Sequence, residues 1–335
     1  MIKEKPLKHL LMMLSVISFA ILAFPACVRH NYSLLDPDTA GKLTLYTTAD
    51  GLPSNEVSDI EPDSKGNLWF SFPGNGMAKL NDVGWSFYTS GPTPLLNNSV
   101  TVLAESGSGS MLIGTTDGLS ILSISNVWSS FTDPSVVTLD VSAIKVASNG
   151  WIWLGTQNKG FYVNTGSGFN RSNFFQGAAI HAIEEGDSGN IYLGTDNGII
   201  KYNGSAYSTI NLSEGLPAQK VKSLRFDSRE RLWIGTDGGY RAAWIDKSGI
   251  HKLDLMTGSD SVTVTSIHED RRGWIWFATE GNGVIRYNGI LPYSYKEFNG
   301  FPENKVNCIG EDKYGDLWFG LGTKGVVKYT LPIGK

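Results

Sequence analysis

The stretch GWIWLGT at residues 150–156 decides the fold, because six variants of it recur along the chain about every 41 residues. Each variant is a short apolar strand built around an aromatic residue or leucine and followed by small residues. The other six are GNLWFSF (66–72), SMLIGTT (110–116), GNIYLGT (189–195), RLWIGTD (231–237), GWIWFAT (273–279) and GDLWFGL (315–321). This period is typical of four-stranded propeller blades and is too long for leucine-rich or ankyrin repeats.

Each repeat contains the same four strand-forming segments in the same order. A small apolar segment such as 141–144 leads into a polar turn such as Asp63–Asn67, in which Asp and Asn brace the chain and Gly supplies the positive φ. The aromatic strand follows, then a Thr-x-x-Gly loop such as 195–198, a third strand, and an outer strand such as 85–89. Short strands separated by turn residues predict antiparallel hairpins throughout.

The two ends of the repeat array complement each other. The last repeat stops after its third strand at 325–329, whereas residues 42–47 (KLTLYT) match an outer strand that has no blade of its own. Pairing them would remove the free edges that an open β array exposes. The sequence therefore predicts an all-β fold, a seven-bladed β-propeller of four-stranded antiparallel blades over residues 42–332, with its last blade closed by the N-terminal strand.

The N-terminus has the features of an export signal. Three lysines among the first eight residues precede an apolar run at 10–24, and Pro-Ala leads directly to Cys27. This order predicts a lipoprotein signal peptide over 1–26, lipidation of Cys27 and a polar tether over 27–41. An ordinary signal peptide with a coincidental cysteine is the alternative. The expected location is the cell envelope of a Gram-negative bacterium, at its periplasmic face or surface, with the lipid as the only contact with a membrane.

Composition and motifs narrow the function. The net charge is −4 and no Lys/Arg cluster is present, so we expect no nucleic-acid binding. The chain contains no nucleophile elbow, P-loop or HExxH motif, and His181, His251 and His268 lie in different repeats without zinc-site spacing. We therefore expect no catalytic residues, no metal and no cofactor.

The repeats resemble the two-component regulator propeller family. Its pattern of Gly-Leu-Pro followed by a turn and Leu-Trp-x-Gly-Thr appears from Gly51 to Trp69, from Gly215 to Thr236 and, more loosely, from Gly300 to Trp318. The resemblance implies an extracytoplasmic sensor propeller of the kind found in hybrid histidine kinases, often associated with carbohydrate uptake. In that family two propellers usually precede a β-sandwich, a membrane helix and a kinase. The sequence contains one propeller and none of those other parts, so we expect this chain to act as a stand-alone lipoprotein.

Candidate binding residues lie where the repeats differ, in loops expected on one rim of the ring. The tryptophans at the repeated strand position are expected to pack between blades instead. The most deviant repeat places Tyr240 beside Arg241, a pair that could stack on a sugar or hold a carboxylate. Ordinary loop drift is the alternative. The remaining candidates on this rim are His181, Lys220, Asn304, Lys305 and Glu280.

These observations favour a non-enzymatic binding propeller, expected to be a monomer, whose partner is a carbohydrate or an envelope protein. One alternative is a lyase, because residues 274–283 (WIWFATEGNG) resemble an element of the streptogramin-inactivating propellers, in which Glu280 is the only matching residue. The other alternative is a structural scaffold within an envelope complex.

Overall fold

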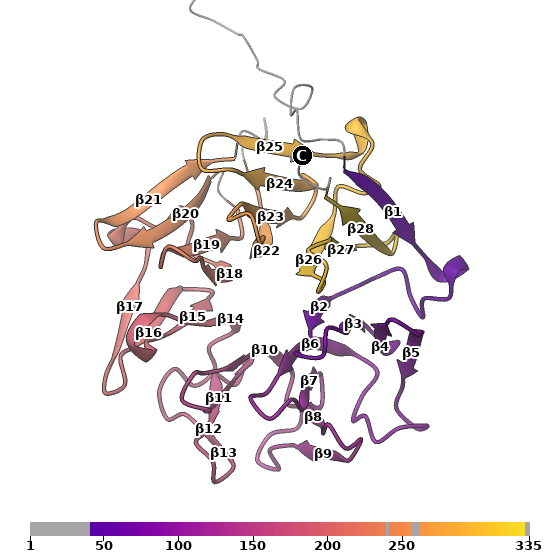
Figure 1. Cartoon of the computed structure of the whole chain (residues 1–335). Helices are drawn as coiled ribbons and strands as arrows, with labels where there is room; N and C mark the ends of the chain where they lie inside the picture. The colour runs from indigo at the N-terminus through magenta and orange to yellow at the C-terminus, as the bar shows by residue number, and fades with distance from the viewer. Residues whose placement is uncertain (1–40, 239–240, 256–260, 332–335) are drawn as a thin grey trace, which may run out of the picture. The chain divides into compact units, whose positions relative to one another are not determined.

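The computed structural model describes residues 41–238, 241–255 and 261–331, without the side chain of Arg241. The predicted Cys27, signal peptide and tether up to residue 40 lie outside these residues. The described chain forms seven four-stranded antiparallel sheets arranged in a ring around a central axis (Figure 1). The seven-bladed propeller is therefore confirmed.

In each blade the strands run from the central axis outward. Blade 1 contains β2 (Asp59–Pro62), β3 (Leu68–Phe72), β4 (Gly76–Asn81) and β5 (Gly84–Tyr88), and blade 2 contains β6 (Val100–Glu105), β7 (Met111–Thr115), β8 (Gly118–Leu122) and β9 (Trp128–Phe131). Blade 3 contains β10 (Val141–Val146), β11 (Ile152–Thr156), β12 (Phe161–Asn164) and β13 (Phe169–Arg171), and blade 4 contains β14 (Ile180–Glu185), β15 (Ile191–Thr195), β16 (Gly198–Tyr202) and β17 (Tyr207–Ile210).

The remaining blades repeat this plan. Blade 5 contains β18 (Val221–Phe226), β19 (Leu232–Thr236), β20 (Arg241–Asp246) and β21 (Gly249–Asp254), and blade 6 contains β22 (Val264–Glu269), β23 (Ile275–Thr279), β24 (Val284–Tyr287) and β25 (Pro292–Tyr295). Blade 7 contains β26 (Val306–Glu311), β27 (Leu317–Leu321), β28 (Val326–Thr330) and β1 (Lys42–Tyr46). The helical elements of the described chain are short 3₁₀ turns: η2 (Thr48–Asp50), η3 (Asp187–Gly189), η4 (Leu212–Glu214) and η5 (Glu297–Asn299). No helix in the described chain has the length and hydropathy needed to cross a bilayer.

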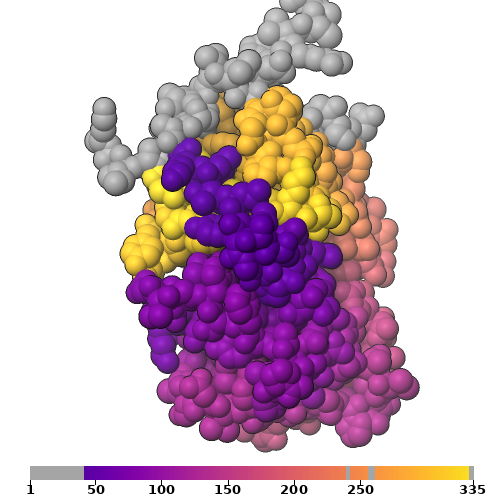
Figure 2. All heavy atoms as spheres, turned by 90° about the vertical axis from the view of Figure 1, so that its right-hand side faces the viewer, coloured from indigo at the N-terminus to yellow at the C-terminus, as the bar shows by residue number. Residues whose placement is uncertain are grey.

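The first strand closes the ring, as predicted. β1 pairs antiparallel with β28, and Leu43 lies opposite Tyr329 while Leu45 lies opposite Val327. Figure 2 shows the indigo start of the described chain lying directly against its yellow end. Each innermost strand contacts the innermost strands of both neighbouring blades, and β2 contacts β26 across the closure. Each blade therefore has a neighbouring blade on both sides, and the ring is closed.

The core lies between blades, where the repeated tryptophans are buried. The ring of Trp318 in blade 7 lies 5.6 Å from that of Phe70 in blade 1, and Trp276 in blade 6 lies 5.7 Å from Phe319 in blade 7. Large aromatic rings bury much apolar area at such contacts. The prediction that these residues pack rather than bind sugars is confirmed.

An aspartate in the turn before the aromatic strand fixes the indole of that strand. In blade 5, Asp227 accepts hydrogen bonds from Trp233 Nε1 at 2.7 Å and from the main-chain N–H of residue 231 at 2.9 Å. Blades 1, 6 and 7 repeat the indole contact. Blade 3 has Ala147 at this position, and Trp153 Nε1 is buried with no hydrogen-bond partner among the described residues.

Glycines near the end of the aromatic strands allow adjacent blades to approach closely. A Cβ built on Gly155 would lie 2.7 Å from Ile180 Cγ2 of the next blade, and one built on Gly235 would lie 2.7 Å from Val264 Cγ1. Real Cβ atoms are essentially never that close to another heavy atom. The predicted role of these glycines in close backbone approach is thus confirmed.

Two sets of loops share one side of the ring, which we call the upper face. One set leads into the innermost strands and the other follows the second strands. They are joined by hydrogen bonds between neighbouring blades, such as Gly198 N–H to the Gln219 carbonyl at 2.7 Å and Gly283 N–H to the Asn304 carbonyl at 2.7 Å. The predicted rim therefore exists.

Candidate functional site

A belt of hydrogen bonds joins the innermost strands on the upper face. Each innermost strand begins at or just after a Val or Ile, and the next residue along the chain supplies the side chain of the belt. In five blades this side chain donates to the carbonyl of the equivalent Val or Ile in the next blade. The pairs are Ser58–Val100 (3.0 Å), Thr101–Val141 (2.5 Å), Ser142–Ile180 (2.5 Å), Thr265–Val306 (2.7 Å) and Asn307–Val57 (2.8 Å).

Blades 4 and 5 depart from this belt. They carry His181 and Lys222 at the position that elsewhere holds Ser, Thr or Asn. In blade 5 the next residue, Ser223, supplies the bond to the Val264 carbonyl at 3.1 Å, whereas His181 turns to Asp196 instead. Two adjacent blades thus place an ionisable side chain where the repeat otherwise places a small polar group. A local departure of this kind is expected at functional sites.

Around this departure the upper face gathers a chain of polar and ionic contacts, which we call the mouth cluster: His181, Asp196, Lys220, Lys222 and Asp237. His181 Nε2 lies 2.9 Å from Asp196 Oδ1, and Lys220 Nζ lies 3.5 Å from Asp196 and 3.4 Å from Asp237. Both carboxylates and the Lys220 ammonium are between 38 and 49% exposed, so a ligand can reach them. Lys222 lies beside Lys220, and the carboxylates of Asp237 and Asp196 act electrostatically on its ammonium group.

The protonation of the mouth cluster follows from burial and from its internal pairs. Burial lowers the pKa of His181, against the effect of Asp196, so the imidazole is neutral at pH 7. Burial likewise lowers the pKa of Lys222, and the neighbouring Lys220 adds to this effect. Burial would also lower the pKa of Lys220, but Asp196 and Asp237 raise it overall. Lys220 therefore stays charged, and the cluster offers both donors and acceptors.

The other predicted rim residues lie in two places. Glu280 forms a bridge with Lys305 on the upper face, with their charged groups 3.8 Å apart. Asn304 braces its own loop, because its side-chain oxygen accepts the Glu297 N–H at 2.9 Å and its carbonyl accepts two glycine N–H groups. The described contacts thus group Lys220 with His181, and Glu280 with Lys305.

The pair taken from the most deviant repeat is only partly described. Tyr240 lies outside the described residues. The main chain of Arg241 begins β20 opposite Asp254, directly after an upper-face loop. Its binding role stays a prediction.

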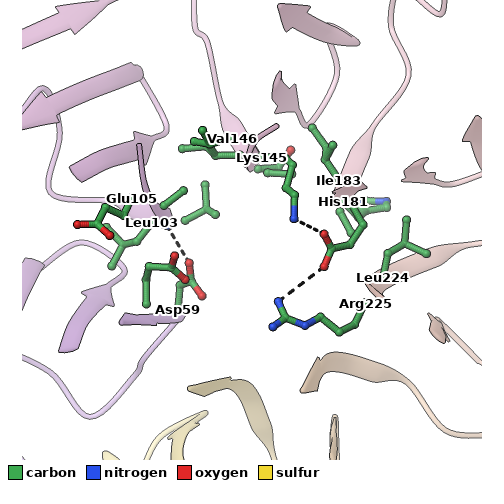
Figure 3. Close-up of a pocket in the computed structure, with 17 residues that line it drawn as sticks. Asp59, Leu103, Glu105, Lys145, Val146, His181, Ile183, Leu224 and Arg225 are labelled. Atoms are coloured by element: carbon green, nitrogen blue, oxygen red, sulfur yellow. Dashed lines mark hydrogen bonds and ion pairs between the residues drawn. The ribbon is translucent and has the colours of Figure 1, made fainter. Parts of the chain in front are cut away.

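Below the mouth cluster lies a cavity of about 340 Å³ lined by the innermost strands of blades 1 to 5 (Figure 3). Its lining is polar and aliphatic, and it contains no aromatic side chain apart from the imidazole of His181. Asp59 and Glu61 lie on β2 at one wall. On the other side, Glu184 of β14 pairs with Lys145 of β10 and lies 3.6 Å from Arg225 of β18.

The two carboxyl groups on β2 are held in unusual protonation states. Burial raises the pKa of Asp59 to about 6, although its oxygens accept main-chain N–H groups from Leu103 at 2.8 Å and Ile60 at 2.9 Å. Burial raises the pKa of Glu61 to about 8, and the neighbouring Asp59 adds to this rise while Arg225 opposes it. At pH 7, therefore, Asp59 is mostly ionised and Glu61 is mostly protonated.

Sequence reasoning missed Lys222 and, apart from His181, the residues that line the cavity. Lys222 could have been found by aligning the innermost segments, because Ser, Thr or Asn stands at its position in five repeats. The cavity residues carry no such signal, since their side chains meet only across the ring. In the described part of the chain, no group of three or more His, Cys, Asp and Glu residues is arranged to hold a metal ion.

Comparison with known proteins finds one matching family model. The model of the two component regulator propeller matches residues 51–74, 215–238, 258–281 and 300–323, which carry the aromatic strands of blades 1, 5, 6 and 7. The predicted resemblance is confirmed, and it extends to blade 6. No curated protein matches the sequence.

Solved structures share the fold of this chain. The extracellular domain of the putative hybrid two component system BT3049 from B. thetaiotaomicron superposes with a TM-score of 0.73 at 19% identity, covering 86% of this chain and 41% of that one. This chain thus spans about two fifths of that domain. Virginiamycin B lyase from Staphylococcus aureus gives a TM-score of 0.73 at 18% identity, covering 87% of this chain and 100% of that one. At these identities the likeness shows the fold alone.

Proposed function

We propose that this propeller is a non-enzymatic binding protein of the bacterial cell envelope, anchored through a lipid on Cys27, and that its ligand is a glycan bound at the mouth cluster. The observation that carries the proposal is the replacement of belt residues by His181 and Lys222 in two adjacent blades. A side chain that does not form the hydrogen bond repeated in the other blades, and that lies instead in a solvent-accessible polar cluster, is better explained by binding than by packing.

The chemistry of the mouth cluster suits a polyhydroxylated ligand. Sugar hydroxyls both donate and accept hydrogen bonds, and the cluster supplies acceptors at Asp196 and Asp237 and donors at Lys220 and Lys222. Two lysines and two aspartates balance in charge, so a neutral or weakly charged saccharide meets no net repulsion. Extracellular domains of putative hybrid two component systems share the fold, which supports a location outside the cytoplasm.

The test is binding of the purified full chain to a glycan array, followed by calorimetry on each hit. Lys222→Thr restores the residue found at the equivalent position of blades 2 and 6, so it should fold normally while weakening binding about tenfold or more, about 1.4 kcal/mol. Lys247→Thr is the matched control, because Lys247 is 94% exposed in a turn between β20 and β21 and should bind as the wild type does.

Other outcomes decide against the proposal. If no glycan binds but an envelope protein is captured through the upper face, the scaffold alternative holds. Turnover of a streptogramin depsipeptide, abolished by Glu280→Gln, would establish the lyase alternative. Equal glycan affinity of Lys222→Thr and the wild type would remove the mouth cluster from the binding site.

A further inference from the structure

The central cavity has two walls of opposite character. On β2, Asp59 and Glu61 point into it, and neither forms an ion pair with a described residue. Opposite them, two cations share one carboxylate, because Glu184 is the described ion-pair partner of both Lys145 and Arg225. One wall is therefore acidic. The other carries two cations and one carboxylate, which leaves a net charge of +1 (Figure 3).

Both walls are able to take a ligand. Arg225 is 44% exposed and its guanidinium lies 3.6 Å from Glu184, so most of its five N–H donors stay available. Asp59 uses each oxygen for one main-chain N–H, which leaves acceptor capacity on both. Electrostatic interactions are stronger in a confined space with few waters than in bulk solvent.

We infer that the central cavity is a second binding site, specific for a small zwitterion such as a free amino acid or a dipeptide. The ligand ammonium would lie against Asp59 and Glu61, and its carboxylate against Arg225 and Lys145. A cavity of about 340 Å³ accommodates a molecule of this size. A neutral sugar would leave both walls uncompensated. The inference does not rest on the glycan proposal.

The carboxyl groups supply supporting evidence. Burial raises the pKa of Glu61 to about 8, so its surroundings disfavour the ionised form. An ammonium bound beside it would reverse that preference, so binding would release a proton. The charged and titratable groups around Glu61 are Asp59 on its own strand, Glu105 on the neighbouring β6, and Lys145, Arg225 and Glu184 across the cavity.

The experiment is calorimetry of the purified full chain at pH 7, where the ligand amines are mainly charged, with L-alanine, alanyl-alanine, ethylamine, propionate and glucose. We expect one of the two zwitterions to bind, with ethylamine and propionate at least about tenfold weaker, because each half-ligand compensates one wall only. Binding of ethylamine or propionate as tightly as the zwitterions would overturn the inference. So would competition by glucose, or failure of both zwitterions to bind.

Variants separate the two walls from the mouth cluster. Asp59→Asn and Arg225→Gln should each weaken zwitterion binding about tenfold or more. Glu105→Gln is the matched control, because Glu105 borders the cavity but its carboxylate accepts hydrogen bonds from Ser64 at 2.7 and 2.8 Å, away from the cavity (Figure 3). Lys222→Thr should leave zwitterion binding intact, so a failure here is distinguishable from a failure of the glycan site. Loss of binding in Glu105→Gln alone would also overturn the inference.

Discussion

Replacing Glu61 by glutamine should stabilise the protein, and by an amount that grows with pH. The carboxyl group of Glu61 has its pKa raised by burial from 4.5 to about 8 in the folded chain. Between these two values the unfolded chain has lost this proton while the folded chain keeps it, so folding stability falls as pH rises. Glutamine resembles the protonated acid and does not titrate, and Glu61→Gln therefore escapes this loss.

The size of the effect follows from the shift. Each pKa unit corresponds to about 1.4 kcal/mol, so a rise from 4.5 to about 8 sets an upper limit of about 5 kcal/mol. Water reaches the cavity and screens the charge, so we expect about 2 kcal/mol at pH 8. The advantage should be near zero at pH 4, grow between pH 5 and pH 8, and then level off.

The assay is urea unfolding followed by tryptophan fluorescence at pH 4, 6, 8 and 9, for the wild type and Glu61→Gln. Glu105→Gln is the control, because its carboxylate is held by Ser64 outside the cavity, and its stability difference should not reproduce the rise with pH. A Glu61→Gln advantage that is equal at pH 4 and pH 8 would refute the reasoning, since only a titrating group gives a pH-dependent difference.

Three further predictions concern the ring itself. Gly155→Ala should lower the free energy of unfolding by about 1–3 kcal/mol because its Cβ would clash with the next blade, whereas Gly107→Ala, with no atom within 4 Å, should change it by less than about 0.5 kcal/mol in the same urea experiment. Ala147→Asp should raise the melting temperature by giving Trp153 Nε1 an acceptor worth about 1 kcal/mol, and an unchanged value would contradict the role of the turn aspartate. Deleting residues 1–46 should expose the edge of β28 and cause self-association, and a stable monomer by light scattering would show that closure by β1 is dispensable.

The fold could be predicted from the sequence because its determinants are local and repeated. A strand pattern such as GWIWLGT at 150–156 specifies a hairpin from its own residues, and seven copies fix the number of blades. The unpaired segment at 42–47 then specified the closure, which the pairing of Leu43 with Tyr329 confirms. Glycine at the repeat position of Gly155 even indicated close approach of neighbouring blades.

The mouth cluster could be predicted in part. His181 and Lys220 were expected on one rim, and both contact Asp196 there. Lys222 went unrecognised because the belt that it interrupts is visible only once side chains of one blade are seen to reach carbonyls of the next.

The cavity was decided by tertiary structure alone. Glu61, Lys145, Glu184 and Arg225 belong to four blades, and nothing in their local sequence differs from an ordinary strand. They meet because ring closure turns the corresponding position of every innermost strand toward one axis. Hydrogen bonding within a hairpin is settled by neighbours along the chain, whereas the charge and pKa of a group in the cavity depend on side chains from the opposite side of the ring, which only the closed ring brings within electrostatic range.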